Sequence, residues 1–134
     1  MSVDLESAVP GVPLVEYQTG PIDREMLARY AEASGDTNPL HLDPAFARKA
    51  GFDDVIVHGM LSMALLGRLL TAHFPAERLL DFSARFTGIV GVGQSLRCVA
   101  RLERRDEAQA VLALEGFDAS GASVISGSAR IALR

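Results

Sequence analysis

The hydrophobic positions change their spacing about halfway along the chain, from a helical period to an alternation typical of strands. In residues 24–34, REMLARYAEAS, apolar side chains recur at one-turn intervals and share one face. Asp23 stands where an N-cap is needed, and Gly35 can take the left-handed conformation that ends a helix. The pattern therefore predicts a helix over residues 24–34.

Two more helices are predicted before the pattern changes. Asp43 in the cap position and Pro44 in the first turn start a short helix, which Gly51 closes. A second stretch, beginning at residue 58 or 59 and continuing to about residue 74, is apolar on nearly every side, and Pro75 ends it. A helix that is hydrophobic all round is buried, so this segment is predicted to be the central helix of the domain.

Alternating segments of strand length dominate the rest of the chain and are separated by turn signals. The four segments are residues 79–90, 94–105, 108–118 and 122–133, and residues 12–18 add a fifth near the start. We expect the four to form an antiparallel meander. One buried helix and about five strands predict an α+β domain whose sheet wraps around the helix. The 134 residues fit a single domain, in which only residues 1–11 look loosely ordered.

Composition removes several classes of function. A net charge of −4 and the absence of Trp leave no electrostatic signature of a nucleic-acid-binding protein. The most apolar stretch is too short to span a bilayer and contains Arg68. The single cysteine, Cys98, permits neither an internal disulfide nor a multi-cysteine zinc site. Because Asp4 and Glu6 replace the basic start of a secretory signal, we expect a cytosolic protein.

Candidate chemistry is concentrated in residues 34–46, SGDTNPLHLDPAF. Asp, Asn and Pro all favour turns, so this stretch is first of all a link between two helices. It also carries a carboxylate and an imidazole five residues apart, Asp36 and His41, with Asn38 between them as a residue that can orient the loop. His58 stands directly before the apolar helix, and spacing alone does not decide between the two histidines.

Residues 30–47, YAEASGDTNPLHLDPAFA, followed by VHGML at 57–61, resemble the MaoC-like family of hot-dog-fold proteins. The best-known members of that family are (R)-specific enoyl-CoA hydratases. The resemblance implies a long antiparallel sheet wrapped around a central helix, and a homodimer joined through sheet edges. The chain departs from the family pattern at Ile89, where members often have Pro, and at Gln94, where they often have a Gly-Asp turn.

The resemblance also implies a set of site residues. Asp36 and His41 would be the acid-base pair, and the backbone N–H of Gly59 would donate to the thioester oxygen. Three supporting candidates are read from the residues themselves: Asn38 orients the loop, His58 fixes the geometry of the helix start or acts directly, and Ser62 packs against the sheet or borders the acyl tunnel. The resemblance implies no metal and no redox cofactor. CoA, or the phosphopantetheine of an acyl carrier protein, would be the part of the substrate that carries the acyl group. Five arginines are candidates for a local patch that would bind its phosphates, although exposed Arg is more often only solvated: Arg85, Arg97, Arg101, Arg104 and Arg105.

The activity implied is the reversible hydration of trans-2-enoyl-CoA to (R)-3-hydroxyacyl-CoA in fatty-acid or polyhydroxyalkanoate-linked metabolism. Three alternatives stay open at this point. They are an acyl-carrier-protein dehydratase subunit that needs a related subunit as its partner, a thioesterase on the same fold, and a non-catalytic module that binds acyl thioesters. The presence of both Asp36 and His41 argues against the last, because binding alone does not need an acid-base pair.

Overall fold

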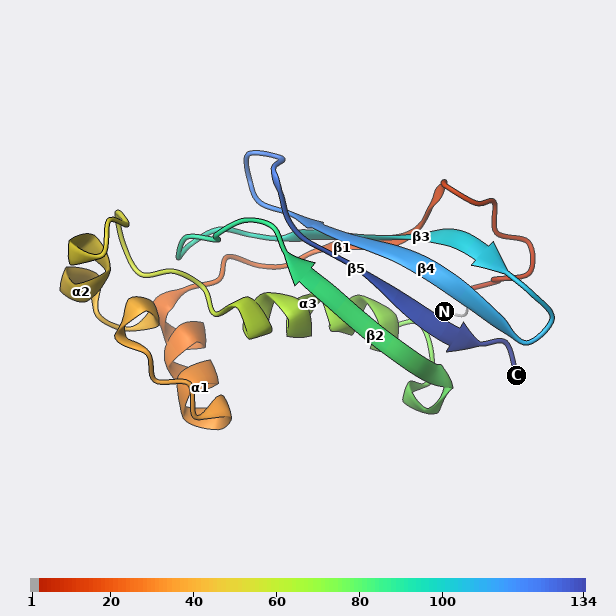
Figure 1. The fold of residues 1–134 in the computed structure, drawn as a ribbon, viewed down its shortest axis with the longest axis horizontal. Helices are drawn as coiled ribbons and strands as arrows, with labels where there is room; N and C mark the ends of the chain where they lie inside the picture. Colours follow the sequence, from red (N-terminus) through yellow and green to blue (C-terminus); the bar gives the residue numbers. More distant parts are fainter. Residues whose placement is uncertain (1–2) are drawn as a thin grey trace.

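The computed structural model describes residues 3–134, and its five strands form one antiparallel sheet (Figure 1). The strand order is β1–β3–β4–β5–β2. The strands are β1 (Pro13–Gln18), β2 (Leu79–Phe86), β3 (Arg97–Arg105), β4 (Gln109–Phe117) and β5 (Ser123–Ala132). The prediction of about five antiparallel strands is confirmed.

The prediction of a four-strand meander is wrong in one connection. Strands β3, β4 and β5 do follow one another as a meander, but β2 pairs with β5 instead of β3, so that Ala84 lies opposite Gly127. Residues 87–96, whose apolar alternation resembles a strand, bond elsewhere. The N–H of Thr87 donates to the carbonyl of Val124 at 2.9 Å, and the link then pairs with residues 55–57. The predicted strand 79–90 therefore ends at Phe86.

The central helix α3 (Gly59–Thr71) lies across one face of the sheet (Figure 1). Its buried side chains are Leu61, Ser62, Leu65, Leu66, Leu69 and Leu70, which pack with the inward residues of the strands. The helix ends at Thr71, three residues before the predicted end, and Met60 on its other side is 56% exposed. Within this chain the sheet covers one side of the helix, so the expectation of burial on all sides is wrong.

Two further helices, α1 (Arg24–Ser34) and α2 (Pro44–Lys49), lie beyond one end of the sheet (Figure 1). The Asp23 side chain accepts from the N–H of Met26 at 2.9 Å and caps α1, and Gly35 ends it with φ of 79°. Both features match the sequence prediction. A 3₁₀ helix, Pro39–His41, was not expected between α1 and α2, and a second one, Ala76–Arg78, leads into β2.

The N-terminal segment has neither helix nor strand between residues 3 and 11, but it is attached to the domain. Leu5 is buried in the core, and the N–H of Gly11 donates to the carbonyl of Leu102 at 2.9 Å. Of the segment expected to be loosely ordered, residues 1 and 2 lie outside the described part. Within residues 3–134, no helix is both long enough and apolar enough to cross a membrane.

Candidate active site

The loop between α1 and α2 is held by short local hydrogen bonds from its own side chains. The N–H of Asp36 donates to Ser34 Oγ at 3.2 Å, and Asp36 Oδ1 accepts from the N–H of Asn38 at 3.3 Å. Asn38 Oδ1 accepts from the N–H of Leu40 at 3.0 Å and so caps the 3₁₀ helix. These side chain to backbone bonds are the reason that a polar loop has one defined path here.

The His41 ring is fixed from behind by the chain that precedes α3. Its Nδ1 lies 2.8 Å from the carbonyl oxygen of Ile56. A carbonyl oxygen can only accept, so Nδ1 carries the proton and Nε2 keeps a free lone pair in the neutral ring. The N–H of Ile56 in turn donates to the carbonyl of Leu40 at 3.1 Å. His41 is thereby held in the tautomer in which Nε2 can act as a base.

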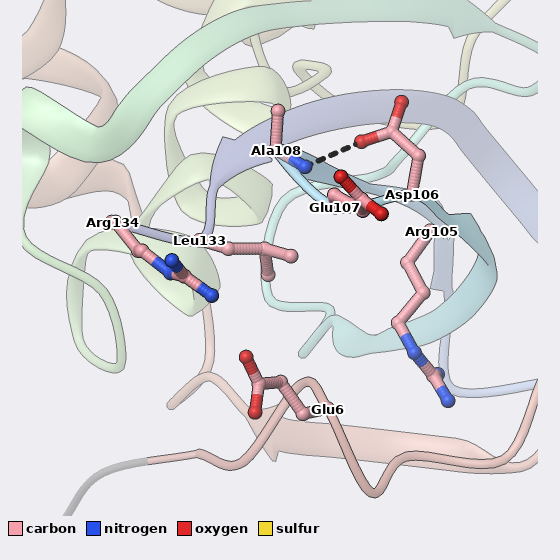
Figure 2. Close-up of a pocket in the computed structure, with 7 residues that line it drawn as sticks. All are labelled: Glu6, Arg105, Asp106, Glu107, Ala108, Leu133 and Arg134. Carbon is pink, nitrogen blue, oxygen red and sulfur yellow. Dashed lines mark hydrogen bonds between the residues drawn. The ribbon is translucent and has the colours of Figure 1, made fainter.

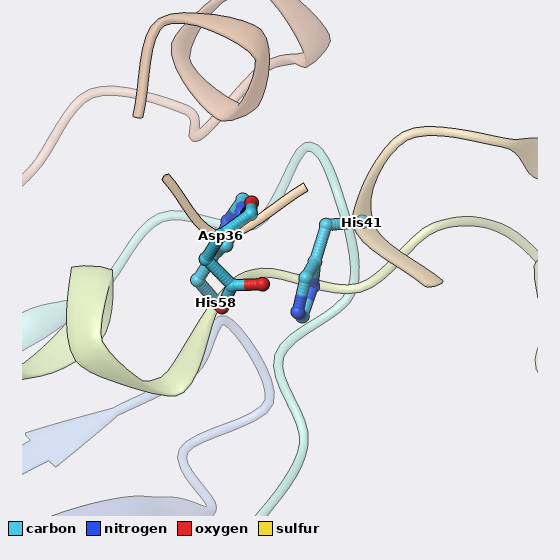
Figure 3. A group of neighbouring side chains, drawn as sticks. All are labelled: Asp36, His41 and His58. Carbon is cyan, nitrogen blue, oxygen red and sulfur yellow. Dashed lines mark hydrogen bonds between the residues drawn. The ribbon is translucent and has the colours of Figure 1, made fainter. Parts of the chain in front are cut away.

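Asp36, His41 and His58 lie together although His58 follows the other two by many residues (Figure 3). One ligand-type atom of each side chain lies within 4.8 Å of the others. The rings of His41 and His58 stack with their centroids 3.9 Å apart, and Tyr30 meets His58 edge-on at 4.8 Å. Asp36 is exposed and His58 is buried. The structure thus brings the predicted pair together and places His58 directly behind it.

His58 occupies the N-cap position of α3, but its side chain makes no capping bond. Its Nε2 lies 3.1 Å from the backbone carbonyl oxygen of Asp36 instead. Burial lowers the pKa of His58 below the ordinary value of 6.5, against the smaller opposing effect of the bond to Asp36. The ring is therefore held in its neutral form. The His58 ring thus contacts the loop that carries Asp36 and makes no capping bond at the start of α3.

These three residues are the kinds that bind metal ions, but their orientation fits a metal poorly. The lone pairs of imidazole lie in the plane of the ring, and zinc binds them at about 2.0–2.1 Å. Here the two rings stack at an interplanar angle of 22°, so their lone pairs run side by side rather than toward one point. One nitrogen of each ring is also occupied by a carbonyl oxygen. The arrangement suits proton transfer better than coordination.

A cavity of about 240 Å³ opens beside His41. Gly59 and Ser62, from the first turn of α3, line it together with His41. The other walls are almost wholly apolar and come from the chain before α3, the end of β2, the link after it and the start of β5: Ile56, Val57, Phe86, Gly88, Ile89, Val90 and Val124. A cavity with a few polar groups at one end and an apolar wall suits an acyl thioester, whose acyl chain is apolar and whose thioester group is polar.

Phe86 and Val124 were not anticipated as site residues. Sequence alternation can place them on the inward side of a strand, but it does not tell which end of the sheet meets the start of α3. Ile89, which replaces the Pro of the family pattern, is 59% exposed and forms part of the cavity wall. This departure from the family pattern therefore falls in the lining of the cavity.

Gly59 has a backbone N–H at the first position of α3, and no acceptor within residues 3–134 receives it. The N-terminus of a helix leaves such groups free and adds positive potential. A side chain at Gly59 would not point into open space, because its Cβ would lie 3.4 Å from the Phe86 ring. The Phe86 ring therefore lies against Gly59, and both residues line the cavity.

Other hollows and charged groups lie away from this cluster. One of about 580 Å³ sits near the N-terminal segment, the turn between β3 and β4, and the C-terminus (Figure 2). It contains side chains of both charges, and Asp106 stabilises the turn by accepting from the N–H of Ala108 at 2.8 Å.

Four of the five arginines considered for a phosphate-binding patch have protein partners: Arg97 with Glu16, Arg101 with Glu115, Arg104 with Glu103, and Arg105 with the carbonyl of Ala8.

Comparison with known proteins gives one consistent result. Residues 6–115 match the family model described as a MaoC like domain. The chain is 37% identical to the (R)-specific enoyl-CoA hydratase of Aeromonas caviae over 111 residues, which cover 80% of this chain and 83% of that protein. It is 42% identical to the mitochondrial 3-hydroxyacyl-[acyl-carrier-protein] dehydratase of Arabidopsis thaliana over 79 residues, which cover 59% of this chain and 48% of that protein. The solved structure of R-hydratase PhaJ1 from Pseudomonas aeruginosa superimposes with a TM-score of 0.86 at 30% identity, over 97% of this chain and 84% of that one.

Proposed function

The chain belongs to the MaoC-like dehydratase family and has the hot-dog fold, and on this premise we propose that it is a hydro-lyase acting on acyl thioesters. The reaction is the reversible addition of water to trans-2-enoyl-CoA, which gives (R)-3-hydroxyacyl-CoA. One observation carries the proposal: His41 lines a largely apolar cavity and has Nδ1 bound to the Ile56 carbonyl, and a side-chain oxygen of Asp36 lies within 4.8 Å of a nitrogen of its ring.

Hydration needs a group that takes a proton from water and a group that gives a proton to the α carbon. In the proposed mechanism Asp36 and His41 share one water molecule. Its oxygen forms a bond to the β carbon, and one of its protons is relayed by the pair to the α carbon, so that the atoms of water are all accounted for. Positioned acid-base groups of this kind contribute about 10²–10⁴-fold to rate. Dehydration uses the same groups in reverse.

The thioester oxygen gains negative charge as the enolate develops. In the proposal the backbone N–H of Gly59 donates to it, with the helix dipole of α3 adding to the stabilisation. Ser62 lies one turn further along α3 and borders the same cavity, so we assign it to the wall near the thioester. Neither a metal nor a redox cofactor has a step in this mechanism. CoA or carrier-protein phosphopantetheine is part of the substrate.

A carrier-protein thioester is a second candidate substrate, and the 42% identity to the Arabidopsis dehydratase supports it. We also propose a homodimer joined at a sheet edge, since β1 and β2 each leave one edge without a partner strand among residues 3–134. A heterodimer with a related but different subunit is the alternative.

For the compartment we propose the cytosol, on the basis of a free thiol at Cys98.

The experiment follows the absorbance of the conjugated enoyl thioester after trans-2-butenoyl-CoA is mixed with the purified protein. The proposal predicts that conjugation is lost without release of free thiol, and that the product is oxidised by an (R)-specific and not an (S)-specific 3-hydroxyacyl-CoA dehydrogenase. Release of free CoA would identify a thioesterase instead, and binding without turnover a non-catalytic module. Repeating the assay with an enoyl thioester of acyl carrier protein shows which of the two thioesters is the substrate. Measuring the mass of the protein, and repeating the assay after a related subunit is added, separates a homodimer from a subunit that needs a partner.

A further inference from the structure

His58 is the only titratable side chain within residues 3–134 that is buried at the candidate site, with 1% of its surface exposed. His41, Gly59 and Ser62 line the cavity, whereas neither His58 nor Asp36 is among its lining residues. The neighbours of His58 are Asp36 and His41 (Figure 3), and the ring of Tyr30 meets it edge-on. A buried polar group in such a place normally has a structural partner, and that partner is the backbone of Asp36.

The bond to Asp36 defines the state of the ring. Because a backbone carbonyl can only accept, Nε2 must carry a proton. The groups that face the ring are Tyr30 from α1, with Asp36 and His41 from the loop, and its own helix contributes no charged side chain there. Nδ1 is buried and has no partner within the described residues, so a second proton there would have no acceptor. His58 is thus a neutral donor, committed to one bond.

We infer that His58 is a positioning residue, which holds Asp36 and His41 in register with each other for the reaction proposed above. Its Nε2–H anchors the Asp36 backbone, and its ring gives His41 a flat surface on which to stack. His41 is held from its other side by the Ile56 carbonyl. The pair therefore has two separate anchors in the chain around the start of α3, and His58 is the one that acts on both members.

A direct acid-base role for His58 would need an exchangeable nitrogen that reaches substrate. Nε2 is occupied by the Asp36 carbonyl, and the remaining nitrogen is buried away from solvent. The free lone pair at the cavity belongs to His41. Misplacement of a catalytic group by about 1 Å can cost about 10²-fold in rate, which is the size of effect expected when an anchor is lost.

Two substitutions separate the two contacts. In His58→Gln the amide nitrogen stands as many bonds from Cα as the imidazole Nε2, so it can still donate to the Asp36 carbonyl. In His58→Phe the ring is kept for stacking but the donor is removed. We expect kcat to fall by about 10²-fold in His58→Phe and by less than about tenfold in His58→Gln, with KM within about threefold of wild type in both. His73→Gln, at the other end of α3, is the matched control and should change nothing.

Each outcome decides a different question. Equal activity of wild type, His58→Gln and His58→Phe overturns the positioning role. A loss in His58→Gln as deep as that in His41→Ala, with a changed pH profile of kcat, overturns it in favour of direct proton transfer. If wild type itself turns over no enoyl thioester, the proposed function has failed, and that result is distinct from either of these.

A second measurement does not depend on how well the variants fold. The chain has three histidines, so the ring nitrogens of wild-type protein can be assigned by ¹⁵N NMR. We expect His58 to show a protonated Nε2 and an unprotonated Nδ1 from pH 8 down to the acid limit of folding. A ring protonated on Nδ1 at neutral pH would contradict the bond to Asp36 and with it the inference.

Discussion

Replacing Gly59 by proline removes one backbone N–H and is expected to slow the reaction strongly while leaving the fold in place. Gly59 is the first residue of α3, the helical position where proline is best tolerated because its N–H has no helical partner. The residue before a proline must be extended, and His58 already has φ of −58° and ψ of 131°. The local backbone therefore accepts the change.

The size of the effect follows from the proposed role of that N–H. Loss of one donor to a developing oxyanion typically costs about 10²–10³-fold in kcat, or about 2.7–4 kcal/mol. The bond forms only as charge develops, so kcat and kcat/KM should fall together. Gly59→Ala is the control: it keeps the N–H, and its Cβ makes an ordinary contact at 3.4 Å with the Phe86 ring. We expect its kcat to stay within about threefold of wild type, as for changes worth about 0.5 kcal/mol.

The assay is steady-state hydration of trans-2-butenoyl-CoA by wild type and both variants, with thermal unfolding and circular dichroism to show that each is folded. The reasoning is refuted if folded Gly59→Pro retains the rate of Gly59→Ala. It is also refuted if Gly59→Ala loses as much activity as Gly59→Pro, because the loss would then come from crowding against Phe86 rather than from the missing donor.

Three further predictions concern ionisation. Burial raises the pKa of Cys98 to about 11, so the native protein should react with a disulfide reagent at pH 8 only as fast as it unfolds, and rapid native labelling would contradict this. Burial lowers the pKa of His58, so below about pH 6.5 the unfolded state binds a proton that the folded state does not. The free energy of unfolding, measured with denaturant, should therefore fall as the pH decreases below about 6.5, and more steeply in wild type than in His58→Gln. Equal slopes of unfolding free energy against pH in the two proteins would contradict this. The Arg24 side chain holds the pKa of Asp54 at about 2, so any stability advantage of wild type over Asp54→Asn should be complete above pH 4 and vanish as the pH falls toward 2; an advantage that survives there would argue against the pair.

Local signals made the helices predictable. Asp23, Gly35 and Asp43 act through hydrogen bonds and backbone conformations of their immediate neighbours, and a sequence carries that information directly. The partner of β2 was not predictable in this way, because the choice between β3 and β5 depends on where residues 87–96 run. Those residues bond to 55–57 and 124, so their path is decided by contacts far along the chain.

In the candidate site, too, the sequence indicates the residues themselves but not the contacts that depend on the folded chain. Asp36 and His41 could be named as candidates because the motif that resembles the family contains both of them. The state of the His41 ring was not predictable, since it depends on the carbonyl of Ile56, which reaches it only after the chain folds back. The bond from His58 to the Asp36 backbone is likewise a tertiary contact, and so is the edge-on contact between the His58 ring and Tyr30 of α1.

The central claim is that Asp36 and His41 form an acid-base pair that hydrates enoyl thioesters. The measurement that tests it most directly compares turnover of trans-2-butenoyl-CoA by wild type, Asp36→Asn and His41→Ala, each shown to be folded. We predict that each single variant loses about 10²–10⁴-fold in kcat, and that the double variant loses little more, because the two groups act on one water molecule. Folded variants that keep the full wild-type rate would contradict the claim.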